Sequence, residues 1–502
     1  MFAQLFRTKS LDALMAETEV EGRSLKKVLG PWSLMALGVG AIIGTGIFAT
    51  IGSASAGDAN RPGAGPALML SFVLTAVVCS FTALCYAEFA SMVPLAGSAY
   101  TYAYATLGEL VAWIIGWDLL LEYAIGNTAV AISWSNYMVA LLEGVNIHFP
   151  AWLATDYRTA LKSPEILAQA PHLFGVPIIF NALAASIVAF ITIVLVWGVK
   201  ESARFNAIMV VTKLVVLAFF VFVGVRYTQP ANLHPFAPNG FAGIGAGAAI
   251  IFFAYIGFDA VSTCAEECKN PGRDMPIGII GSLVVCTVIY VIVGAVFAGL
   301  IPYPVLAKLN ESQRAEALAF AMTYVKMPTW MVGVVALGSV VAQTAVLLVF
   351  QLGQPRILFA MARDGFLPKV FTKVHPRFGT PHVSTILTGV LVGGVSTFVN
   401  IDEMVDLTNI GTLFAFILVC IGIMVLRFKD PNRKRPFKVP LGPVFLPGLG
   451  LVSCLGLIAY LPPSSWWRFF AWLLVGLGIY AVYGYRNSAL RKQHAAASGR
   501  QI

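Results

Sequence analysis

The chain has 502 residues, of which 58% are hydrophobic and only 11% charged, and its mean hydropathy is +0.81. Soluble domains carry about 25% charged residues, so a water-soluble protein of this length is excluded. The 33 Lys and Arg residues outnumber the 24 Asp and Glu residues, which leaves a formal net charge of +9. All seven cysteines fall in apolar segments, so no disulfide framework is expected.

A helix that crosses a membrane needs about 20 apolar residues. Twelve stretches satisfy this requirement, and we predict spanning helices at residues 31–56, 65–92, 106–144, 176–199, 203–226, 240–266, 276–301, 330–360, 383–399, 407–426, 443–461 and 465–485. Two longer connections, 145–175 and 302–329, hold no domain-sized core. The sequence therefore predicts an all-α polytopic membrane protein with twelve transmembrane helices.

The distribution of cations predicts the orientation of these spans. With segment 1–28 on the cytoplasmic side, the inner segments carry about three times as many Lys and Arg residues as the outer ones. The tail 486–502 is then cytoplasmic too. The basic stretch 427–438 is an orientation signal and a contact for anionic membrane lipids. Nucleic acid is not an expected partner, because nothing outside the membrane is large enough to form a binding domain.

The first span is unusually rich in glycine, with four glycines between residues 38 and 46. Each glycine weakens a helix by about 1 kcal/mol relative to alanine. Widely spaced glycines can serve close helix packing, but the cluster Gly44-Thr45-Gly46 favours a helix that unwinds in mid-membrane. Free backbone groups at such a break must face a ligand or a polar cavity.

The sixth span repeats this pattern, with Gly245 and Gly247 leading to Gly257 and the buried acid Asp259. An offset of five spans predicts two inverted five-helix repeats, each opening with a broken helix. We assign the repeats to residues 29–226 and 227–426, followed by two further helices within 427–485. Free amides attract a carboxylate and free carbonyls attract an ammonium, so the two breaks suit a zwitterionic amino acid.

These residues resemble the amino acid–polyamine–organocation superfamily, most closely the bacterial type of its cationic amino acid transporter branch. The resemblance covers roughly residues 25–490. It rests on residues 38–48, 85–89, 94–100, 252–263, 266–278 and 408–416. It implies a LeuT-like fold, a 5+5 inverted repeat plus two helices.

The resemblance also implies a substrate site at the two breaks. The substrate carboxylate would meet the backbone amides of Ile43, Gly44, Thr45 and Gly46, with help from the Thr45 hydroxyl. The ammonium would meet the carbonyls of Phe253, Ala254 and Ile256, and the Phe253 ring would gate the ligand.

Lys213 lies near the middle of the fifth span. A charge at that depth costs at least about 2.5–3.5 kcal/mol, so a function is the first hypothesis. In sodium-coupled members of the LeuT-like fold a sodium ion ties the first helix to the eighth. A lysine on the fifth helix resembles the proton-coupled members, and Lys213 would donate to carbonyls near Gly40. The alternatives are a permanently charged strut and snorkelling to the interface.

Several other ionisable side chains fall within spans. Asp118 and Glu122 share one helix face and could relay protons or bind a cationic side chain; the resemblance favours Glu122 near the site. Asp259 is expected to cap or polarise the broken sixth helix. Tyr290 either offers its hydroxyl to the site or bonds to a backbone carbonyl. Glu88 is expected to pair with Arg or Lys.

We therefore predict a secondary active amino acid transporter, a proton-coupled importer with alternating access, in the cell membrane. An exchanger of the same fold is the nearest alternative. An intramembrane enzyme is disfavoured because no catalytic or metal-binding set is evident, and a channel because a gated broken-helix site implies occlusion. We expect no cofactor, with the proton rather than sodium as the coupling ion. Neutral substrates are favoured over cationic ones, and the sequence does not indicate accessory subunits.

Overall fold

A computed structural model describes residues 5–9, 27–58, 60–92, 98–198 and 203–492 of the chain. These residues are mostly helical, and within them only β1 (His172–Leu173) and β2 (Val176–Pro177) form strands, paired antiparallel. Most of the predicted segment 1–28 and the end of the predicted tail 486–502 lie outside the described residues.

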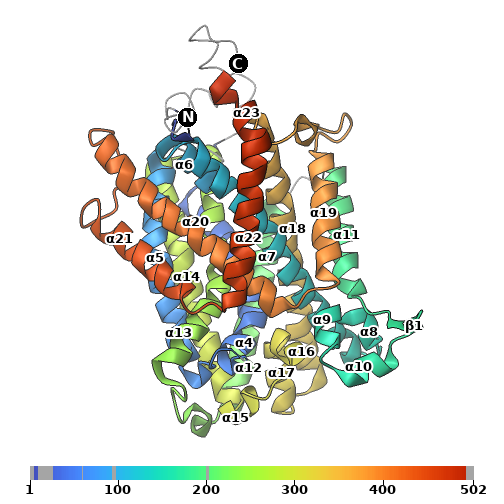
Figure 1. Ribbon diagram of the computed structural model, residues 1–502. Coiled ribbons are helices and arrows are strands. Elements are labelled where there is room, and N and C mark those ends of the chain that lie inside the picture. The colour runs from blue at the N-terminus through green and yellow to red at the C-terminus, as the bar shows by residue number, and fades with distance from the viewer. Residues whose placement is uncertain (1–4, 10–26, 59, 93–97, 199–202, 493–502) are drawn as a thin grey trace.

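The longer helices run between the two ends of the molecule (Figure 1). Their bounds are α5 Leu68–Met92, α7 Glu109–Gly144, α11 Ala182–Trp197, α12 Ala203–Gly224, α14 Pro271–Leu300, α18 Thr329–Arg363, α19 His382–Ser396, α20 Ile401–Lys429, α21 Phe445–Ile458 and α22 Pro463–Ile479. Two further spans are each divided into segments. They comprise α3 Pro31–Ile42 with α4 Ile51–Ala56, and α13 Gly240–Ile251 with the 3₁₀ segments η5 Phe252–Tyr255 and η6 Asp259–Glu267.

Shorter helices occupy the connections. Their bounds are α6 Ser98–Thr106, α8 Ala151–Ala154, α9 Tyr157–Ala160, α10 Pro164–Gln169, α15 Tyr303–Leu306, α16 Glu311–Ala315, α17 Ala317–Tyr324 and α23 Tyr485–Asn487. The long connections 145–175 and 302–329 are thus built from α8–α10 and α15–α17. These six helices gather at the lower end in Figure 1, which we name the loop end.

Both ends of the described chain meet at the opposite end of the molecule, which we name the terminal end. The backbone amide of Glu109 donates to the carbonyl of Arg7, and the Glu109 carboxylate accepts a hydrogen bond of 2.7 Å from Ser488. Residues 7 and 488 therefore lie at the same end of the molecule.

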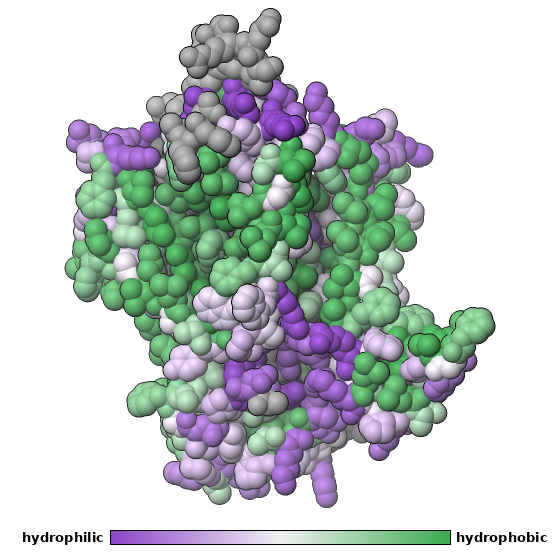
Figure 2. Space-filling view, viewed as in Figure 1, coloured by the Kyte–Doolittle hydropathy of each residue, from purple (hydrophilic) through white to green (hydrophobic). Residues whose placement is uncertain are grey.

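Membrane character is evident from both length and surface. Seven described helices are long and apolar enough to cross a membrane, or eight if the bent pair α3 and α4 is one span. Three shorter apolar helices, α11, α19 and α21, have 10–17 residues. Figure 2 shows a broad band of hydrophobic side chains with hydrophilic ones gathered above and below it. The chain is a polytopic helical membrane protein.

Helix boundaries differ from the prediction where local signals were overlooked. The fourth span was predicted from residue 176, but α11 begins at Ala182, because Asn181 caps it by accepting from the amide of Ala184 and residues 176–177 form β2. The third was predicted from residue 106, whereas Gly108 at φ +105° separates α6 from α7. A left-handed residue of this kind interrupts a helix, and glycine adopts it most readily.

Candidate substrate site

The first predicted span is broken part-way along its length. α3 ends at Ile42, Ile43 is extended with φ −73° and ψ 105°, and a π-helix, η1 (Gly46–Thr50), leads into α4. The two halves are bent by 43°. A helix that restarts after a break begins with N–H groups that lack acceptors in their own turn. The break predicted from the glycine cluster is therefore confirmed.

The sixth predicted span is also broken. α13 continues directly into η5, which ends at Tyr255. The chain then turns through Gly257 at φ +118° before η6 begins. The amide of Gly257 donates to Asp259 Oδ1 over 3.3 Å. Asp259, which is buried, thus satisfies a backbone donor at the break, as predicted for a capping role.

The two breaks lie directly against each other because glycine removes the side chains between them. A Cβ on Gly46 would lie 2.1 Å from Ala254 Cα, and a Cβ on Gly257 would lie 2.9 Å from the carbonyl oxygen of Ala41. Any larger residue at Gly46 would drive the two main chains apart. The glycine pattern that predicted unwinding therefore also produces this contact.

Tyr290 of α14 joins the two breaks. Its buried hydroxyl lies 3.0 Å from the carbonyl oxygen of Ile42 and 2.9 Å from that of Ala254. Of the two alternatives for Tyr290, bonding to a backbone carbonyl is the one observed. The partners are carbonyls exposed by the breaks, so the hydroxyl stands where a substrate ammonium is expected.

Lys213 of α12 reaches the first break from the other side. Its side chain is fully buried, and Nζ donates to the carbonyl oxygens of Gly40 over 2.6 Å and Ile43 over 2.8 Å. These carbonyls close α3, where the helix dipole is negative and favours a cation. The predicted contact near Gly40 is confirmed, and it excludes snorkelling.

A cavity of about 230 Å³, here named the vestibule, connects this region with the terminal end. It begins at Gly40 and Ala41 beside the first break and reaches Tyr100 and Ala360. Arg356 of α18 also lines it and is exposed. The site therefore has a passage on this side.

Comparison with known proteins identifies the family. The amino acid permease family model matches residues 29–481. The chain belongs to the amino acid permease family. A methylthioribose transporter of Bacillus subtilis (strain 168) is 43% identical over 98% of this chain and all of the relative. The branched-chain amino acid permease BcaP of the same strain is 44% identical with the same coverage.

More distant relatives are transporters as well. The vacuolar cationic amino acid transporter 4 of Arabidopsis thaliana is 36% identical over 85% of this chain and 68% of the relative. The resemblance drawn from the sequence motifs is therefore confirmed. So is the prediction of a transport protein rather than an enzyme, since the family and these relatives are permeases and transporters.

Not every residue predicted for the permease site lies at the breaks. Residues 43–46 and 253–256 do, and the Thr45 hydroxyl is buried without a hydrogen-bond partner among the described residues. The Phe253 side chain is buried. Glu122 is buried too, but it does not line the vestibule. It shares a face with Asp118, whose Oδ1 lies 2.8 Å from where a Cβ on Gly411 of α20 would stand.

The family motifs carry structural contacts as well. Asn409, in the motif 408–416, donates to the carbonyl oxygen of Ala249 near the end of α13 over 2.8 Å. Glu88 pairs with Arg427 and Arg435, as predicted, with Glu88 Oε1 lying 3.0 Å from the Arg427 Nε. Most of the motif 94–100 lies outside the described residues.

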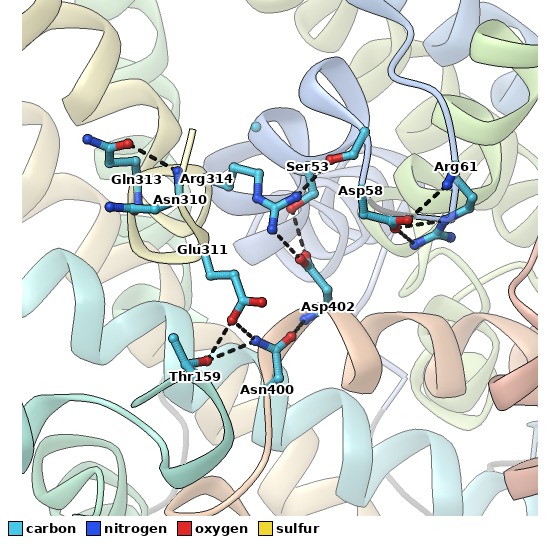
Figure 3. Close-up of polar contacts among 12 residues, drawn as sticks. Ser53, Asp58, Arg61, Thr159, Asn310, Glu311, Gln313, Arg314, Asn400 and Asp402 are labelled. Carbon is cyan, nitrogen blue, oxygen red and sulfur yellow. Dashed lines mark hydrogen bonds and ion pairs between the residues drawn. The ribbon is translucent and has the colours of Figure 1, made fainter. Parts of the chain in front are cut away.

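Sequence reasoning missed a polar network at the loop end of the permease (Figure 3). Arg61 makes two hydrogen bonds of 2.8 and 2.9 Å to the carboxylate of Asp406 in α20, and it also binds Asp58. Both Arg61 and Asp406 are buried. This ion pair joins the loop after the first broken helix to α20.

A second set of contacts continues the network. The Asp402 carboxylate accepts a hydrogen bond of 2.7 Å from the Ser53 hydroxyl of α4 and lies 3.4 Å from the guanidinium of Arg314. Arg314 in turn donates a hydrogen bond of 2.7 Å to the carbonyl oxygen of Gly57. Figure 3 shows these side chains converging from α4, α16 and α20. The four-residue spacing of Asp402 and Asp406, which places both on one helix face, is the signal that could have revealed this network.

Proposed function

We propose that this permease is a secondary active amino acid transporter of the cell membrane with a LeuT-like 5+5 inverted repeat plus two helices. The breaks in the first and sixth spans, one in each of the repeats 29–226 and 227–426, support this arrangement. In this proposal the twelve transmembrane helices are the seven long apolar helices, the bent pair, α7 and the three shorter apolar helices. The terminal end is then cytoplasmic and the loop end faces outward.

In this proposal the substrate binds across the two breaks. Its carboxylate accepts from amides within residues 43–46 and from the unpartnered Thr45 hydroxyl, because helix N-termini attract anions. Its ammonium binds carbonyls within residues 253–256 and competes with Tyr290 for the Ala254 carbonyl. The Phe253 ring gates the site.

The proposed mechanism is alternating access. The ion pairs of the loop end close one side, and the vestibule opens the other. Substrate must bind the inward-open and outward-open states with different affinity to move this equilibrium. The arrangement corresponds to the state that releases an imported substrate to the cytoplasm.

The position of Lys213 supports the proposal of proton coupling. A fully buried ammonium that holds two carbonyls at the end of α3 occupies a position where a coupling ion would act. Loss of the ammonium proton would weaken both hydrogen bonds and release α3 from α12. Proton binding and the conformation of the first broken helix are then linked, with no sodium required.

Uptake into proteoliposomes tests this proposal. We expect an inward pH gradient to drive accumulation of labelled amino acid in the wild type. Lys213→Ala should accumulate at least about tenfold less while still exchanging substrate across the membrane, because the site itself is intact. Lys213→Arg keeps a positive charge that does not lose its proton. It therefore distinguishes the loss of proton binding from the loss of a permanently charged structural contact.

Three results would contradict parts of this proposal. Full accumulation by Lys213→Ala would remove the coupling role. Stimulation by sodium alone would reverse the driving ion. Counterflow without any net accumulation in the wild type would indicate an exchanger.

A further inference from the structure

The vestibule has an unusual charge composition for a passage that must release a zwitterion. Among its described lining residues only Arg356 carries a charge, and the remainder are apolar or neutral polar side chains such as Leu119, Tyr123 and Thr263. Arg356 lies two turns inside the end of α18, and no hydrogen bond or ion pair links it to another described residue. Its charge is therefore available to a passing substrate.

The acids that could balance this charge do not line the vestibule. Asp118, Glu122 and Asp259 are buried, and none of them lines the vestibule. Asp364 stands near the mouth, but it accepts from the Tyr100 hydroxyl over 2.6 Å and lies 3.9 Å from Lys9. Among the described residues of the wall, a substrate leaving the breaks thus meets one cation and no acid.

We propose that Arg356 is a specificity-determining residue that pairs with the substrate carboxylate in the vestibule and repels cationic side chains, so that this permease transports neutral amino acids. The inference rests on the proposed function and adds its substrate class. A neutral amino acid offers Arg356 its carboxylate, and guanidinium–carboxylate pairs are strong and directional. A lysine or arginine substrate brings a second cation close to the guanidinium of Arg356, and like charges repel each other at short distance.

This assignment also accounts for the position of Glu122. The sequence offered it as the one acid able to bind a cationic substrate side chain. Glu122 lies outside the vestibule wall. It is one turn from Asp118 on the helix face that is directed toward Gly411 of α20. In the vestibule, Glu122 therefore offers no carboxylate to a cationic side chain.

The test compares leucine and lysine in proteoliposomes containing the full-length protein. For the wild type we expect kcat/KM for leucine to exceed that for lysine at least about 50-fold. Arg356→Glu should lower this ratio at least about tenfold, because the carboxylate of leucine loses its partner in the vestibule and the side chain of lysine gains one. The ratio for Arg356→Gln should lie between those of the wild type and Arg356→Glu. Arg363→Glu is the matched control, because it reverses an exposed charge two turns further along α18 that does not line the vestibule.

Ionic strength supplies an independent readout. Added salt screens exposed charges, so the wild-type ratio should fall with salt while that of Arg356→Gln stays flat. An unchanged ratio in Arg356→Glu, or equal transport of leucine and lysine by the wild type, would overturn the inference and leave the transporter assignment standing. Failure of the wild type to exchange any amino acid would overturn the proposed function itself, and the inference with it.

Discussion

The two ends of the permease differ in how their helices meet. At the loop end, Arg61 and Asp406 form a buried ion pair, and Ser53, Arg314 and Asp402 extend it across α4, α16 and α20. At the terminal end, a cavity of about 230 Å³ separates the first broken helix from α18, and its wall is largely apolar.

Under the proposed alternating-access mechanism, this difference means that the gates at the two ends use different chemistry. Ion pairs form over short distances and can be replaced by water when the helices separate, so a polar closure opens into solvent without exposing apolar surface. An apolar wall, by contrast, closes by packing. Substitutions that weaken the loop-end contacts should therefore shift the equilibrium toward the outward-open state, and the vestibule offers a native reporter of that shift in the half-buried thiol of Cys264.

The largest effect is expected from Asp406→Ala. Removing one partner of a buried ion pair costs about 3–5 kcal/mol, and Asp58 retains part of the contact with Arg61. We expect the maleimide labelling rate at Cys264, read by peptide mass spectrometry, to fall at least about tenfold as the vestibule closes.

The exposed pair between Arg158 and Glu403 at the same end provides the control. Exposed pairs contribute about 0–1 kcal/mol, so Arg158→Ala should leave the labelling rate within about twofold of the wild type. An unaltered rate in Asp406→Ala would mean that the ion pair does not hold the closed loop end.

The broken helices were the part of this site that a single sequence could predict. Clustered glycines and a buried acid are local signals, and they led to the breaks near Gly44–Gly46 and near Gly257 and Asp259. The individual site residues within 43–46 and 253–256 came from the resemblance. Lys213 was found because an isolated cation in an apolar run has few structural explanations. Its acceptors near Gly40 came from a resemblance, and the structure supplied their distances.

The loop-end network could not be predicted in the same way. Arg61 and Asp406 are 345 residues apart, and each is an ordinary charged residue near the end of a predicted span. Only the tertiary fold brings the loop that holds Arg61 beside the N-terminal turns of α20. The same holds for Glu122, whose helix face was evident from spacing while its neighbours were not.

A smaller effect is expected when a single hydrogen bond of the closure is lost. Ser53→Ala removes the 2.7 Å bond to Asp402, and such a bond contributes about 1 kcal/mol net. Labelling of Cys264 should slow by up to about fivefold. Ser55→Ala is the control, because its hydroxyl bonds to the carbonyl of Gly52 in its own helix. Equal rates in the two variants would show that the Ser53 contact does not contribute to closure.

The smallest effect concerns Asp156, which lies outside the spans at the N-terminus of α9. Its carboxylate accepts a hydrogen bond of 2.9 Å from the backbone amide of Thr159. Burial raises the pKa of Asp156 to about 6, against about 3.9 in an unfolded chain. The folded state therefore binds the proton more tightly, so the contribution of Asp156 to stability is greatest below pH 4 and is lost as pH rises through about 6.

Asp156→Asn isolates this titration, because asparagine is also a good helix cap. Two pKa units correspond to at most about 3 kcal/mol, and the large unfolding entropy of a chain of this size converts that energy into a small shift of the melting temperature. Between pH 4 and pH 7 we expect the apparent melting temperature of the wild type to fall by about 2 °C relative to Asp156→Asn. Parallel profiles would mean that Asp156 keeps an ordinary pKa, and that its contribution to the loop end is that of a capping acceptor alone.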